Sequence, residues 1–240
     1  MSQQFLKHIQ RGATAEVADA VAADPSLITW RDAQGVSALM WSVYSGQTVI
    51  RNFLLVQIAN AGLPLDLFEA AAIGDPPEII AAIEATPESV PQPLVQLAQL
   101  DPATPSDPMQ SFSADGWTAL HLAAAFGTPE AVQLLLSKGA KVDAVSNNPQ
   151  SNQPLHAALA LSRNPETIQL LLQAGADPNA RQTAGFTALF SVAAANRRDL
   201  AEILIAAGAD PALTNTFGQS AASYARERTH TELADWLESL

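Results

Sequence analysis

Cysteine is absent from the 240-residue chain. Its absence excludes disulfide scaffolds, thiol nucleophiles and zinc or iron–sulfur sites that depend on cysteine ligands. No apolar run approaches the roughly 18 residues of a membrane-spanning helix, and the N-terminus lacks the apolar stretch of a secretory signal. We therefore expect a cytoplasmic protein with no membrane partner.

Basic residues are also scarce: 12 Lys and Arg stand against 24 Asp and Glu, for a net charge of −12. Between Arg51 and Lys138 lie 86 residues without Lys or Arg, and this middle third holds ten acidic residues. A field of that sign repels DNA, RNA and anionic lipid, so no nucleic acid is expected as a partner. It would favour a basic protein, although solubility is the simpler explanation.

Motifs that carry chemistry are missing as well. The chain has no phosphate loop, dinucleotide fingerprint or zinc-protease helix, and the segment around Gly218 and Ser220 lacks the second glycine of a nucleophile elbow. Aspartates recur at turn positions, where they suit turn chemistry better than paired acid and base catalysis. We expect no enzyme activity, no cofactor and no metal site.

What the chain does have is alanine, 46 residues of it, and a repeated pattern. An apolar residue is followed seven positions later by Gly or a small polar residue. The starting residues are Phe5, Leu39, Leu67, Leu120, Leu155, Leu189 and Ala222. Four of the six steps between them are 33 to 35 residues, and the other two are 28 and 53. A fixed period of this length is typical of stacked repeat units.

Each unit follows one order of elements. A Gly-containing turn precedes a hydroxyl residue that can cap a helix: Ser37, Thr118, Thr187 and Ser220. A short Ala-rich helix follows, as in residues 120–126, and a second helix then begins with Pro129 and carries Leu at helical spacing. Small alanines allow the first helices to approach closely, while leucines fill the layer between the helices.

The run Trp117-Thr118-Ala119-Leu120-His121-Leu122-Ala123-Ala124, followed by a second helix ending in Lys138-Gly139-Ala140, resembles an ankyrin repeat. The resemblance covers nearly the whole chain and is closest to the stand-alone arrays common in bacteria. It implies an all-α solenoid of about seven helix pairs, forming a single domain over 1–240. The first pair (1–31) and the last (214–240) would act as capping repeats. It also implies that His121 and His156 make structural hydrogen bonds to neighbouring turns.

The two irregular steps predict departures from a uniform array. The 28-residue step leaves no room for a turn finger between Ala61 and Asp66. The 53-residue step contains a Pro-rich insertion at 91–111. Loops of this length are often functional, but a surface loop without a role explains it equally well.

The resemblance implies a non-catalytic monomer that binds another protein through its concave face. Finger tips and first helices would line that face. The expected partner-binding residues are Gln34, Val36, Tyr44, Asp115, Trp117, Phe126, Phe186, Phe217 and Gln219. Trp117, Phe186 and Phe217 would serve as anchors, since exposed aromatic residues dominate binding energy. The competing interpretation is that each tip aromatic packs on its neighbouring finger.

Three alternative functions belong to other classes. The chain could be an acidic inhibitor or mimic that binds a basic protein through its middle third. It could be a small-ligand receptor with a pocket beneath the insertion. It could also be a hydrolase, which would require a convergent Ser, His and Asp cluster that the sequence does not reveal.

Overall fold

The computed structural model describes residues 2–84 and 107–240. Its helices are α1 (Ser2–Gln10), α2 (Thr14–Ala23), α3 (Ala38–Tyr44), α4 (Thr48–Asn60), α5 (Leu67–Ile73), α6 (Pro76–Glu84), α8 (Ala119–Phe126), α9 (Pro129–Ser137), α10 (Pro154–Ala157), α11 (Pro165–Gln173), α12 (Ala188–Ala194), α13 (Arg198–Ala206), α14 (Ala221–Glu227) and α15 (Thr231–Glu238). Short 3-10 segments are η1 (Pro25–Thr29), η2 (Pro108–Gln110) and η4 (Thr183–Gly185), and η3 (Ala158–Ser162) is a π-helical turn continuing α10.

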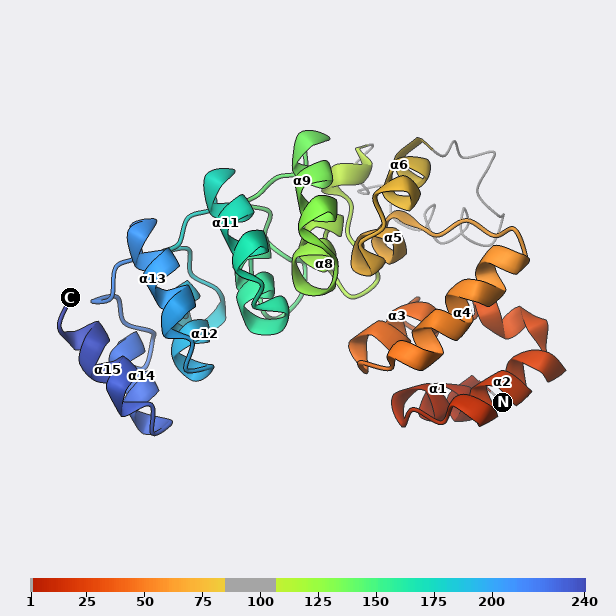
Figure 1. Cartoon of the computed structure of the whole chain (residues 1–240), viewed down its shortest axis with the longest axis horizontal. Helices are drawn as coiled ribbons and strands as arrows, with labels where there is room; N and C mark the ends of the chain where they lie inside the picture. The colour runs from red at the N-terminus through yellow and green to blue at the C-terminus, as the bar shows by residue number, and fades with distance from the viewer. Residues whose placement is uncertain (1, 85–106) are drawn as a thin grey trace.

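The described helices form consecutive antiparallel pairs, which we number units 1 to 7 from the N-terminus. Unit 4 is α8 with α9, unit 5 is α10 and η3 with α11, unit 6 is α12 with α13, and unit 7 is α14 with α15. Figure 1 shows them stacked in an arch, with the second helices α9, α11 and α13 on the outside. We call the first helix of each unit the inner helix. The predicted all-α repeat solenoid is confirmed.

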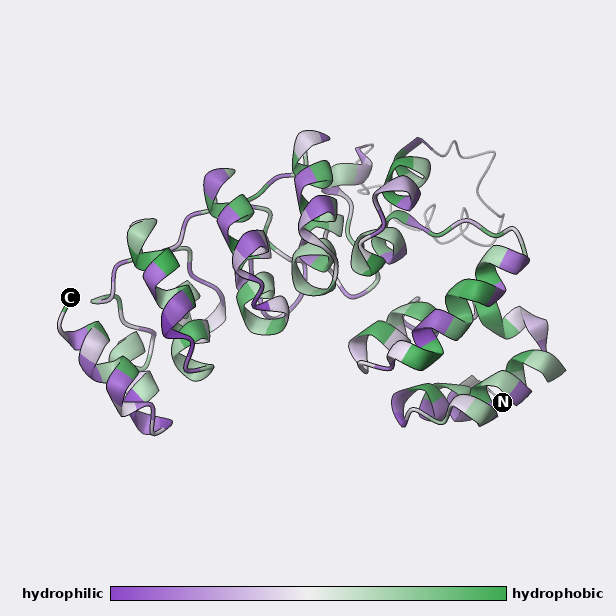
Figure 2. Cartoon of the chain, in the orientation of Figure 1, coloured by the Kyte–Doolittle hydropathy of each residue, from purple (hydrophilic) through white to green (hydrophobic). Residues whose placement is uncertain are grey.

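Alanine makes the close stacking possible. The inner helix α8 is buried over seven consecutive residues, Ala119 to Ala125, because it has neighbours on both sides. In the following units, the inner-helix alanines Ala158, Ala193 and Ala225 are fully buried. The outer helices bury one stripe of Leu, Ile or Val and show hydrophilic residues elsewhere, as Figure 2 illustrates for α9 and α11.

Turn fingers join the later units. A backbone hydrogen bond links each finger to the next: Asn147 N to Gly116 O (2.7 Å), Thr183 N to Gln150 O (3.0 Å) and Thr216 N to Ala184 O (3.0 Å). Ser37, Thr118 and Ser220 cap their helices through side-chain oxygens as predicted, whereas Thr187 occupies the cap position without that bond.

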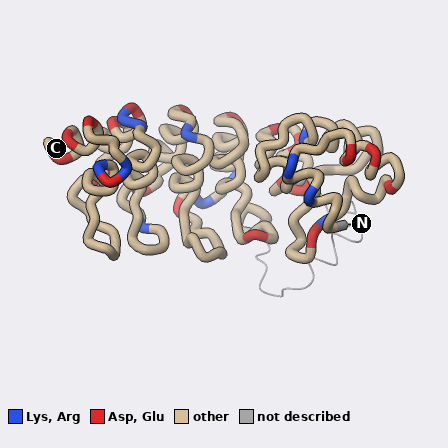
Figure 3. Tube along the Cα trace, turned by 90° about the horizontal axis from the view of Figure 1, so that it is seen from below, with Lys and Arg blue, Asp and Glu red and all other residues tan. Residues whose placement is uncertain are grey.

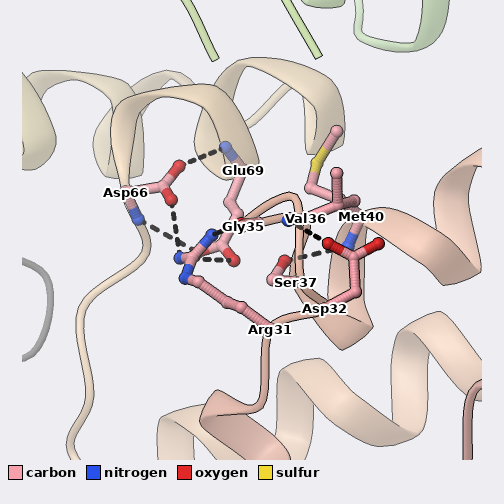
Figure 4. A network of polar contacts seen from close by, with 8 residues as sticks. All are labelled: Arg31, Asp32, Gly35, Val36, Ser37, Met40, Asp66 and Glu69. Atoms are coloured by element: carbon pink, nitrogen blue, oxygen red, sulfur yellow. Dashed lines mark hydrogen bonds and ion pairs between the residues drawn. The ribbon is translucent and has the colours of Figure 1, made fainter. Parts of the chain in front are cut away.

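Unit 3 has no finger, as the short step predicted. A six-residue connection leads from α4 to α5, and Asp66 caps α5 in a reciprocal capping box with Glu69. Arg31, from the finger before α3, reaches into this gap (Figure 4). Its Nη2 lies 2.8 Å from Asp66 Oδ2 and 3.3 Å from Glu69 Oε1. An ion pair therefore occupies the place where a finger would otherwise stack.

Unit 5 contains one residue more than its neighbours between the first residue of the inner helix and the first residue of the outer helix. The π-helical turn η3 absorbs that residue. The chain consequently leaves the inner helix at Arg163, in the left-handed region at φ 54°, and not at Ser162 as the seven-residue pattern predicted.

Most of the 91–111 insertion lies outside the described residues. Its end is described: Asp107 caps η2 by accepting a hydrogen bond from Met109 N, and the Met109 side chain is buried. Among the helices of 2–84 and 107–240, none combines the length and the apolar character needed to cross a membrane.

Candidate functional site

The predicted partner-binding residues separate into buried, half-buried and exposed positions. Val36 is 8% exposed and belongs to the hydrophobic core, so the expectation that it lies open at a finger tip was wrong. The physical reason is that the finger folds back: Asp32 accepts from Val36 N, and the backbone of the turn carries Gln34 outward and Val36 inward. Gln34 is exposed at the tip.

Tyr44, Asp115 and Phe126 come together across the gap left by unit 3. Tyr44 donates its hydroxyl proton to Asp115 Oδ2 at 2.6 Å, and the Tyr44 and Phe126 rings lie 5.5 Å apart between centroids. Burial, followed by the charge of Asp115, raises the pKa of Tyr44 far above its ordinary value. These three residues hold unit 2 to unit 4, which makes this cluster chiefly a structural joint.

The predicted aromatic anchors differ in exposure. Trp117 is half-buried and packs edge-on against His121, with centroids 5.7 Å apart. Phe217 is 72% exposed at the tip of the last finger. Gln219 is half-buried between Asn215 and Glu227, donating from Nε2 to Glu227 at 2.7 Å.

Phe186 belongs to an aromatic cluster that spans units 6 and 7. Its ring contacts those of Phe190 on α12 and Tyr224 on α14, and the three pairs of centroids are 5.1 to 5.6 Å apart. Phe190 is buried, while Phe186 and Tyr224 remain half-exposed and form a floor. An open groove of about 360 Å³ crosses this floor, within the range of ligand-binding pockets. We call it the C-terminal groove. It is lined by Ala160, Arg163, Gln182, Phe186, Phe190, Ser191, Ala194 and Tyr224.

Phe190 and Tyr224 were not among the predicted partner-binding residues, although the sequence carries a signal for Phe190. Phe190 follows Thr187-Ala188-Leu189 and therefore occupies the position that His121 and His156 hold in units 4 and 5. An imidazole there bonds back to the helix start, whereas phenylalanine cannot. Phe190 instead turns this position into part of the aromatic floor of the groove.

The two motif histidines have the structural role that the resemblance implied. His121 Nε2 lies 3.0 Å from Asn152 O, and His156 Nε2 lies 3.0 Å from Ala180 O, each on the following finger. Burial lowers the pKa of His121 to about 4 and also lowers the pKa of His156. Both rings are therefore neutral near pH 7 and join successive units.

Other hollows offer less to a ligand. A hollow of about 420 Å³ between α2 and α4 has a mainly apolar lining with no charged group. The described residues contain no group of three or more His, Asp or Glu placed to hold a metal ion. The proposed ligand pocket beneath the insertion lies largely outside the described residues.

Comparison with known proteins agrees with this architecture. Residues 79–182 match the model of ankyrin repeats in three copies, and residues 184–216 match that of the ankyrin repeat. Together the matches cover more than half of the chain. The chain belongs to the ankyrin-repeat family, whose repeats form protein–protein interaction modules and are generally non-catalytic.

Two relatives share part of this array. The chain is 42% identical to the B-cell lymphoma 3 protein homolog of Mus musculus over 95 residues, 39% of this chain and 21% of that protein. It is 37% identical to the E3 ubiquitin-protein ligase KEG of Arabidopsis thaliana over 99 residues, 41% of this chain and 6% of that protein. The chain thus spans about a fifth of the first relative and a small fraction of the second.

Proposed function

We propose that this chain binds a partner protein through its concave face, with the C-terminal groove at the centre of the contact. The observation that carries the proposal is that the groove crosses units 5, 6 and 7 and leaves two aromatic rings half-exposed. Exposed aromatic surface in a concave setting is typical of binding hot spots. Phe217, at the tip of the last finger, extends the apolar surface toward the partner.

The distribution of acidic residues supports the concave face over the acidic middle third as the main contact. Four of the eight acidic side chains described in that region maintain local structure: Asp66, Glu69, Asp107 and Asp115. The other four lie on or beside the outer helices α6 and α9: Asp75, Glu78, Glu84 and Glu130. Their charge is therefore directed away from the concave face.

The proposal predicts that an added side chain in the groove blocks partner binding without unfolding the chain. Ala194 lines the groove and is exposed, so Ala194→Arg should fill part of the space while changing the melting temperature by less than about 2 °C. Substituting Phe186 would be less informative because its ring packs on Phe190. The measurement is chemical cross-linking of the chain to its partners in an extract of the source cells. Partners that are recovered with the unaltered chain should be absent with Ala194→Arg.

Gln169→Arg is the matched control, since it places the same side chain at an exposed position of the outer helix α11. Partners bound through the groove should be recovered with this variant as with the unaltered chain. Equal recovery with both variants would contradict binding through the C-terminal groove.

A further inference from the structure

The inner helix of unit 5 ends at an arginine whose backbone lies in the left-handed region. In units 1, 2 and 3 the corresponding place is taken by glycines with positive φ: Gly12, Gly46 and Gly74. Units 5, 6 and 7 place Arg163, Asn196 and Thr229 there, at φ 54°, 53° and 65°. A side chain in the left-handed region costs about 1–2 kcal/mol relative to the right-handed one, a cost that glycine avoids. The conformation therefore recurs at this place in the array, and what distinguishes Arg163 is its position in the C-terminal groove.

Arg163 lines the C-terminal groove, and its side chain is exposed. Arg228 is not among the lining residues, but it contacts one of them: its guanidinium carbon lies 3.8 Å from the Tyr224 ring centroid, and its Nη2 donates to Tyr224 Oη at 2.7 Å. Within residues 2–84 and 107–240, neither arginine forms an ion pair, whereas Arg197, Arg198 and Arg226 do.

The nearest acidic side chain along the helix is Glu227, which accepts a hydrogen bond from Gln219. One arginine therefore lines the groove and a second stacks on its Tyr224, and the described residues give neither a carboxylate partner. The C-terminal units as a whole are not cationic, and Figure 3 shows blue segments beside red ones there, so the attraction for an anion is confined to these two side chains.

We propose that the C-terminal groove binds an acidic peptide segment of a partner protein, in which carboxylates flank one bulky apolar side chain. The apolar side chain would lie on Phe186 and Tyr224, and the carboxylates would accept hydrogen bonds from the Arg163 and Arg228 guanidinium groups. Planar guanidinium groups suit carboxylates because they can donate two parallel hydrogen bonds. A nucleic acid would provide anions too, but the overall negative charge of the chain repels an extended polyanion. The inference rests on the proposed concave-face function and specifies its partner.

The test is selection of random 12-residue displayed peptides against the full chain. The enriched peptides should carry Asp or Glu next to Phe, Trp or Leu. The Kd of a selected peptide should rise about tenfold with Arg163→Gly and about tenfold with Arg228→Gln, and it should rise with salt concentration. Lys138→Gln, which removes one positive charge at the end of the outer helix α9, should leave the Kd within twofold.

Arg163→Gly provides a second readout. The variant should unfold at a temperature a few degrees higher than the unaltered chain, because glycine relieves the left-handed conformation. Weaker peptide binding by a more stable protein cannot arise from unfolding. A lower melting temperature would show that Arg163 has a structural role at this position.

The outcomes separate the partner chemistry from the location of the site. Neutral or basic enriched peptides, no enriched peptide, or affinities unchanged in both arginine variants would overturn the acidic-segment inference. Suppose that the enriched peptides were neutral or basic, or that their affinities were unchanged in both arginine variants. If Ala194→Arg still abolished their binding, binding through the concave face would stand. If selected peptides bound Ala194→Arg normally, the groove would fail as the binding site.

Discussion

Arg31→Ala is expected to lower the free energy of unfolding by about 3 kcal/mol at pH 7, because it leaves two neighbouring carboxylates without their cation. The Glu69 side chain is 8% exposed and that of Asp66 is 26% exposed. Burial raises the pKa of Glu69, the charge of Asp66 raises it further, and Arg31 opposes both. Removing Arg31 would therefore leave the carboxylate pair partly buried and mutually repulsive.

Urea-induced unfolding followed by circular dichroism measures this loss. Arg181→Ala is a close control: Arg181 Nη1 donates to Gly185 O at 3.2 Å, as Arg31 Nη1 donates to Gly35 O at 3.1 Å, but Arg181 has no carboxylate partner among the described residues. This variant should lose about 1 kcal/mol, the ordinary contribution of hydrogen bonds.

The double variant Arg31→Ala/Glu69→Gln should recover part of the loss, since the neutral amide removes the repulsion. The loss should also shrink as the pH falls below 7, because the pKa of Glu69 is raised to about 7 even beside Arg31 and the carboxyl group takes up a proton more readily without it. Equal losses for Arg31→Ala and Arg181→Ala would show that the ion pair contributes little and that packing of the short connection holds unit 3.

Acidification from pH 7 to pH 4 is expected to destabilise the array through His121 and His156. The ordinary histidine pKa is 6.5, and burial lowers that of His121 to about 4 and also lowers that of His156. Between these values the unfolded chain binds protons that the folded chain does not, so stability falls as the pH falls. The effect of His121 alone amounts to about 3 kcal/mol at pH 4, from about 1.4 kcal/mol per pKa unit.

Glu69 acts in the opposite direction, because its raised pKa makes the folded chain bind a proton that the unfolded chain releases. Its stabilising contribution is fully present below the ordinary pKa of 4.5 and is lost as the pH rises from there toward 7. Two histidines outweigh one carboxyl group, so the slope between pH 6.5 and pH 4 should retain the sign set by the histidines.

The measurement compares unfolding free energies at pH 7 and pH 4 for the unaltered chain and for His121→Gln/His156→Gln. Glutamine keeps a polar group at the helix start but does not titrate, so the double variant should lose several kcal/mol less on acidification. The single variant Glu69→Gln should lose more than the unaltered chain. Parallel pH dependence of the unaltered chain and the double histidine variant would contradict neutral buried imidazoles.

The sequence predicted the repeat architecture because its determinants are local. Ser37, Thr118 and Ser220 cap their helices within three residues of their own positions, and alanines and leucines recur at helical spacing. The 28-residue step likewise revealed a missing finger, since a shortage of residues needs no tertiary information. The hydrogen bonds of His121 and His156 followed from the family resemblance.

The candidate site was harder to predict because it depends on which units the fold brings together. Gln34 and Val36 lie two residues apart in the same turn, and only the folded finger determines that Val36 is buried while Gln34 is exposed. Phe186 becomes half-buried because Phe190 and Tyr224, from two different helices, lie against it. Periodicity alone does not show that one extra residue in unit 5 becomes a π-helical turn that moves Arg163 to the groove.

The sequence by itself determined that short helix pairs stack in one dimension, since each unit carries its own caps, turn glycines and apolar stripe. Only the tertiary structure decided how charge and aromatic surface are distributed. Arg31 binds carboxylates 35 and 38 positions away, and the groove joins side chains from three successive units. Such contacts depend on the angle and spacing between neighbouring units, which packing of the whole array sets and no single unit encodes.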